Sequence, residues 1–82
     1  MGLIRLSAQN IIFTFSTDKF VSMGYSGSDS NIIISLVNQH IIIPVVHNNF
    51  MKLYMEIEKK IKMCKDNEVE EIKVNEIHIR TR

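Results

Sequence analysis

The sequence predicts a single α+β domain, spanning residues 1–82, in which an antiparallel, meander-rich sheet of five to six short strands packs against one amphipathic helix. Three observations lead to this fold class. Short apolar runs separated by turn residues fill the chain up to residue 46, and such runs are typical of strands. One stretch of helical periodicity follows at about 48–66, and a β-type pattern closes the chain at 69–82. The expected order is β-β-β-β-β-α-β.

Charged residues are unevenly distributed along the chain. The formal net charge is only +1, which argues against a strong electrostatic attraction to nucleic acid or membrane. Fifteen of the acidic and basic residues follow Asn49, and the part before residue 48 holds only four, which are Arg5, Asp18, Lys19 and Asp29. The first half is therefore a nearly uncharged β-region.

Three strands are expected at 3–8, 11–16 and 20–25. Apolar side chains recur at every second position of each segment, which is the pattern of a strand with one buried face. Residues 9–10 and 17–19 are turn formers, so the three strands should follow one another as a meander. The Ser-rich stretch after them is expected to be a loop.

The next two strands, at 32–37 and 41–46, are apolar on both faces and turn at 38–40. A strand with one face in water alternates apolar and polar residues, whereas a strand covered on both faces does not. A sheet of five or six strands is about 25 Å across, and a helix with its side chains is about 10 Å wide. One helix therefore leaves apolar surface bare, unless the sheet closes into a small barrel. Pro44, which has no backbone N–H, should place the second strand at an edge or end it early.

The helix is predicted at about 48–66. Its apolar side chains follow a 3.6-residue period, at Phe50, Leu53, Tyr54, Ile57, Ile61 and Cys64. Asn48 or Asn49 is the expected N-cap, and Asn67 is the expected left-handed stop. Cys64, the single cysteine, lies on the core stripe, where we expect a structural role in a reducing compartment.

The last fourteen residues carry two apolar pairs in opposite phase. Ile72 and Val74 share one strand face, whereas Ile77 and Ile79 have the other parity. A β-bulge near residues 75–76, or two separate strand pieces, would reconcile the two phases.

No pattern in the sequence indicates catalysis, a cofactor or a metal site. The three histidines, His40, His47 and His78, have no metal-ligand spacing and no Cys-x-x-Cys beside them. Residues 24–28 approximate a Gly-x-Ser-x-Gly elbow but lack the final glycine. We therefore expect a protein that is not an enzyme. The sequence also contains no signal-peptide pattern and no apolar run of membrane-spanning length, so a cytoplasmic location is expected.

One family resemblance lies at the strand-to-helix junction. The Ile43–Val46 strand end and the helix opening Phe50-x-x-Leu53-x-x-x-Ile57 are similar to the corresponding junction of the PC4-like single-stranded-DNA-binding coactivators, which are dimers. The similarity covers less than a quarter of the chain. It implies a curved sheet whose concave face holds a nucleic-acid strand with basic and aromatic side chains.

The leading functional hypothesis is a small protein-binding module that self-associates, as a dimer, through uncovered sheet surface. The expected contact residues are Ile41, Ile43, Val45, Met51 and Met55, because the strand is bare and methionine is enriched at protein interfaces. The Ile-, Asn- and Lys-rich composition is common in phage and viral proteins, so an accessory or inhibitor protein in the host cytoplasm fits by association.

The alternative hypothesis is a single-stranded nucleic-acid-binding module. Its expected basic contacts are Lys73, His78, Arg80 and Arg82, with Phe20 and Tyr25 as stacking residues. Three or four charges without neighbouring aromatics are a weak signal for this function.

Overall fold

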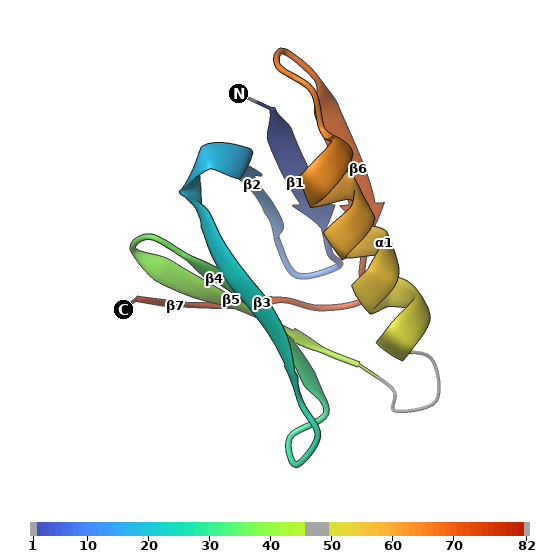
Figure 1. Cartoon of the computed structure of the whole chain (residues 1–82). Helices are drawn as coiled ribbons and strands as arrows, with labels where there is room; N and C mark the ends of the chain where they lie inside the picture. Colours follow the sequence, from blue (N-terminus) through green and yellow to red (C-terminus); the bar gives the residue numbers. More distant parts are fainter. Residues whose placement is uncertain (1, 46–49, 82) are drawn as a thin grey trace.

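The computed structural model describes residues 2–45 and 50–81 and has the predicted α+β class (Figure 1). Its elements, in chain order, are β1 (Leu3–Ser7), β2 (Ile12–Ser16), the 3-10 helix η1 (Thr17–Lys19), β3 (Phe20–Ser26), β4 (Asn31–Leu36), β5 (Gln39–Pro44), α1 (Phe50–Met63), β6 (Val69–Lys73) and β7 (His78–Thr81). Five strands, one helix and a C-terminal β segment follow one another as expected. The predicted class and order are confirmed.

The strands form two sheets, whereas the sequence predicted one. The first has the order β2-β1-β6 and the second the order β3-β4-β5-β7. β6 lies parallel to β1, and the other pairs are antiparallel. The expected three-strand meander is absent, because η1 carries the chain from one sheet to the other and β3 pairs with β4.

The C-terminal segment consists of two separate strand pieces, which was one of the two predicted solutions. β6 extends the first sheet and β7 extends the second. The Asn10 side chain holds the connection between them, because its amide nitrogen donates to the Ile77 carbonyl oxygen at 2.7 Å and its oxygen accepts from the Ile77 N–H at 3.2 Å. Ile72 in β6 and Ile77, immediately before β7, are therefore both buried despite their opposite phases.

Of the two outcomes expected from Pro44, the early end is the one observed, because β5 ends at this proline, whereas the strand is not an edge over most of its length. β7 pairs with β5 from Gln39 to Ile42, so β5 has a neighbour on both sides there. Pro44 falls beyond this pairing, where its missing N–H breaks no ladder bond on that side. The sequence pattern located the proline correctly but did not reveal the returning strand.

One hydrophobic core joins both sheets and the helix. It includes Ile4, Leu6, Phe15, Ile32, Ile34, Leu36, Ile41, Ile43, Ile57, Ile61, Ile72 and Ile77. The opposite face of the β4–β5 hairpin is less apolar than expected, since only Ile33 and Ile42 lie there, half-buried, among polar partners such as Ser35 and His40. The surplus of bare apolar surface inferred from the sequence is correspondingly small.

α1 lies between the two sheets at their open side. It runs beside β6 in Figure 1, and its Ile57 and Ile61 side chains enter the core. The helix ends at Met63, and Asn67 adopts a left-handed backbone with φ of 67° in the following turn. The predicted N-cap asparagines and His47 lie outside the described residues.

Candidate protein-binding surface

The two sheets have four edge strands, which are β2 and β6 in the first and β3 and β7 in the second. An edge strand presents backbone N–H and C=O groups that no neighbouring strand satisfies. These groups are the template on which another polypeptide can add a strand. The way in which each edge is protected therefore indicates where a partner can bind.

α1 covers two of the four edges. The Tyr54 hydroxyl donates to the carbonyl oxygen of Met23 on β3, at 3.2 Å. The Lys60 ammonium donates to the carbonyl oxygen of Glu71 on β6, at 2.9 Å. The Tyr25 ring of β3 also stacks on Phe50 of the helix, with centroids 3.8 Å apart. One helix side chain thus donates to an outward carbonyl oxygen at each of these two edges.

Charge protects the third edge, β7. His78 and Arg80 are exposed on this four-residue strand, and His78 is paired with the carboxylate of Glu76. Charged side chains on an edge oppose strand addition, because an added strand would remove water from them at a cost in free energy. β7 is therefore a poor template for another strand.

β2 has neither form of protection. Its sequence, Ile-Phe-Thr-Phe-Ser, contains no charge, proline or glycine, and no strand within residues 2–45 and 50–81 pairs with its outer side. Of the four edges in the described part of the chain, β2 is the one that is neither covered by α1 nor charged.

The ladder to β1 fixes which backbone groups of β2 face this free edge. The Ala8 N–H bonds to the Ile11 carbonyl at one end, and the Thr17 N–H bonds to the Gly2 carbonyl at the other. Because bonded and non-bonded pairs alternate in an antiparallel ladder, the bonded β2 residues between them are Phe13 and Phe15. The backbone groups of Ile12 and Thr14 therefore point away from β1, toward the free edge.

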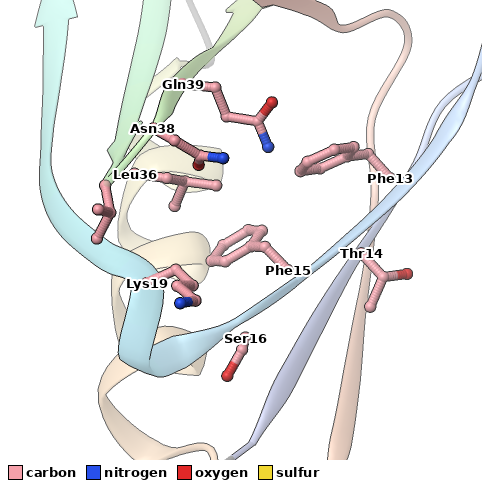
Figure 2. Close-up of a pocket in the computed structure, with 9 residues that line it drawn as sticks. Phe13, Thr14, Phe15, Ser16, Lys19, Leu36, Asn38 and Gln39 are labelled. Carbon is pink, nitrogen blue, oxygen red and sulfur yellow. The ribbon is translucent and has the colours of Figure 1, made fainter. Parts of the chain in front are cut away.

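A pocket of about 410 Å³ runs along the same edge. Figure 2 shows the Phe13 and Phe15 rings pointing into it from β2, with Leu36, Asn38 and Gln39 on the opposite side. Phe15 is only 5% exposed, whereas Val37, which also lines the pocket, is 59% exposed. The free edge thus adjoins an apolar hollow whose rim is polar and includes the charged Lys19.

Two of the predicted contact residues are unavailable to a partner. Ile41 and Ile43 have no exposed surface, because their side chains pack in the core between the two sheets. Their prediction as contact surface is wrong. Val45 is half-buried just after β5, and its N–H bonds to the Ser30 carbonyl at 2.9 Å.

Met51 and Met55 lie on the outer side of α1. They are 53% and 59% exposed, and Met63, which the sequence analysis did not single out, is 65% exposed. Their accessibility is compatible with partner contact, which stays a prediction. β1 and β6 separate them from the free edge of β2, so they belong to a different surface.

The predicted nucleic-acid contacts are not brought together. Lys73 ends β6 in the first sheet, whereas His78 and Arg80 lie on β7 in the second, and Arg82 lies outside the described residues. The register places Tyr25 on the face of buried Ile32, and Phe20 similarly pairs with Leu36 on that face. His78 and Arg80 pair with Ile42 and His40, which lie on the opposite face.

The described residues contain no candidate metal centre. Residues 2–45 and 50–81 contain no group of three or more His, Cys, Asp or Glu side chains placed to hold a metal ion. Within the same ranges, α1 is too short and too polar to cross a membrane. No protein-family model, curated protein or solved structure matches the chain.

The role of β2 as a candidate binding element was not apparent from the sequence. The absence of charge was visible in Ile12–Ser16, but its position at an edge depends on β6 pairing with the far side of β1. That pairing joins residues more than sixty positions apart, and no local pattern indicates it.

Proposed function

We propose that this chain is a small, non-enzymatic protein-binding module that self-associates through the free edge of β2. The observation that supports the proposal is the unequal protection of the four strand edges. α1 hydrogen-bonds to β3 and β6, charge accompanies β7, and β2 alone among the described edges is left open and uncharged.

A strand added at β2 could gain affinity from backbone hydrogen bonds and selectivity from a side-chain pocket. The outward backbone groups of Ile12 and Thr14 supply hydrogen bonds that do not depend on the partner's sequence, and the adjoining pocket accepts side chains of the added strand. Ile12 is 62% exposed, so its burial on association would also contribute hydrophobic free energy.

Sedimentation velocity over a range of micromolar concentrations tests the proposal. The wild-type chain should associate, and the double variant Ile12→Lys, Thr14→Lys should not, because edge lysines oppose strand pairing. The control is Val69→Lys, which places a lysine on β6, at the far side of the same sheet from β2, at a position that is 45% exposed. A wild-type chain that stays monomeric throughout, or a control that loses association equally, would contradict the proposal.

A further inference from the structure

We infer that the strand added at β2 is β2 of a second copy, antiparallel, with Thr14 on the two-fold axis. This inference rests on the proposed self-association and specifies its geometry. It joins the two three-stranded sheets into one continuous six-stranded sheet, in the order β6-β1-β2-β2-β1-β6.

Register selects Thr14 as the residue on the axis. The outward backbone groups belong to alternate residues of β2, and they can bond to a second copy only when those residues face one another. Among the registers that meet this condition, pairing Thr14 with Thr14 is the one that places all five residues of the strand, Ile12–Ser16, opposite each other. Ile12 then faces Ser16 of the second copy, and Phe13 faces its Phe15.

The chemistry of the strand is compatible with pairing to itself. No charged side chain lies on β2, so the two-fold axis brings no like charges together, and directly opposed like charges are what destabilises such pairs. Opposed threonines and opposed aromatic rings are favourable cross-strand neighbours.

The pocket beside β2 offers space for the inward-facing side chains of the added strand. Phe13 and Phe15 of each copy already line the hollow beside their own β2. In the symmetric pair, the same two rings of the second copy would enter from across the free edge and lie against Val37, which is 59% exposed. Each copy would thus fill the hollow of the other.

Symmetric pairing of β2 with β2 produces a closed dimer and not an open chain of copies. If β2 of one copy paired with β7 of the next, the contact would be head-to-tail and would leave a free edge at each end. Arg80 and His78 on β7 oppose that arrangement. Pairing of β2 with β2 uses both free edges at once and stops at two copies.

Disulfide trapping tests the register directly. In a Cys64→Ser background, which keeps a donor for the carbonyl oxygens that the Cys64 thiol approaches, Thr14→Cys should form a covalent dimer under oxidised glutathione. A bonded antiparallel pair holds its Cα atoms about 5.5 Å apart, within disulfide range. Ile12→Cys is the matched control, because two such cysteines would lie about 14 Å apart along the strands.

The outcomes separate this inference from the proposed function. A covalent dimer with Thr14→Cys and little with Ile12→Cys supports the register. A chain that sediments as a dimer but is trapped equally well, or better, at residue 12 overturns the register while self-association stands. A chain that sediments as a monomer overturns both. If the serine background does not fold by circular dichroism, Cys64→Ala replaces it with the same expected pattern.

Discussion

The two strand edges that α1 leaves open, β2 and β7, differ in the way each would receive another strand. β7 carries His78 and Arg80, whereas β2 carries two phenylalanines, an isoleucine and no charge. β2 also adjoins a pocket that its own phenylalanines line. This comparison indicates that, in a small β-rich chain, an unprotected strand edge is a better guide to the binding surface than the total apolar area of a segment. The β4–β5 hairpin is the most apolar stretch of the sequence, and its inward side chains are buried in the core.

The largest expected effect concerns that hairpin. Ile34 is fully buried, whereas its neighbour Ile33 is half-buried on the opposite face. Ile34→Ala should lower the free energy of unfolding by about 3 kcal/mol, through lost burial and a cavity. Ile33→Ala, the matched control, should cost less than about 1 kcal/mol. Urea denaturation measures both, and equal losses would contradict the assignment of inner and outer faces.

Asn10 holds the connection that leads into β7, because its side chain satisfies both backbone groups of Ile77 before β7 begins. Asn10→Ala leaves these partly buried groups without their partner and should cost about 2 kcal/mol of stability. Asn10→Asp, which retains the acceptor for the Ile77 N–H, should lose less. Chemical denaturation compares the two, and an alanine variant as stable as wild type would show that the connection is held elsewhere.

Thr14→Lys alone places a charge on the β2 edge, which is the kind of protection that Arg80 gives to β7. Two lysines would face each other across the proposed two-fold axis, so the dimer dissociation constant should rise at least about tenfold, which corresponds to ~1.4 kcal/mol. The monomer should keep its stability, because Thr14 is exposed. Sedimentation equilibrium gives the constant, and an unchanged value would exclude the β2 edge.

The smallest effect is expected from the reverse change at β7. His78→Thr, Arg80→Thr removes the Arg80 charge and the polar His78 side chain that pairs with Glu76. It should add weak association beyond the dimer, with a dissociation constant above that of β2 pairing. Light scattering would detect the larger species. If combining Thr14→Lys with these two changes suppressed the larger species, β2 and β7 would have begun to pair. If the larger species persisted, they would form through β7 alone.

Local patterns predicted much of the fold but little of the candidate site. Alternation located β1 and β2, and helical periodicity located α1. The opposed phases of Ile72 and Ile77 predicted either a β-bulge or two strand pieces, and the structure has the second. Those signals lie within a few residues of chain. Which strands are edges depends on β6 beside β1 and β7 beside β5, contacts between distant segments that follow from packing of the whole core. The buried positions of Ile41 and Ile43 have the same origin.

Amide hydrogen exchange of β2 tests the central claim most directly. At high dilution, the N–H groups of Ile12 and Thr14 should exchange quickly, because they face the free edge. At concentrations where the chain associates, both should become protected, while the amides of β7 should exchange at an unchanged rate. Protection of Ile12 and Thr14 that does not depend on concentration, or an equal change on β7, would contradict the account of β2 as the edge through which this protein binds.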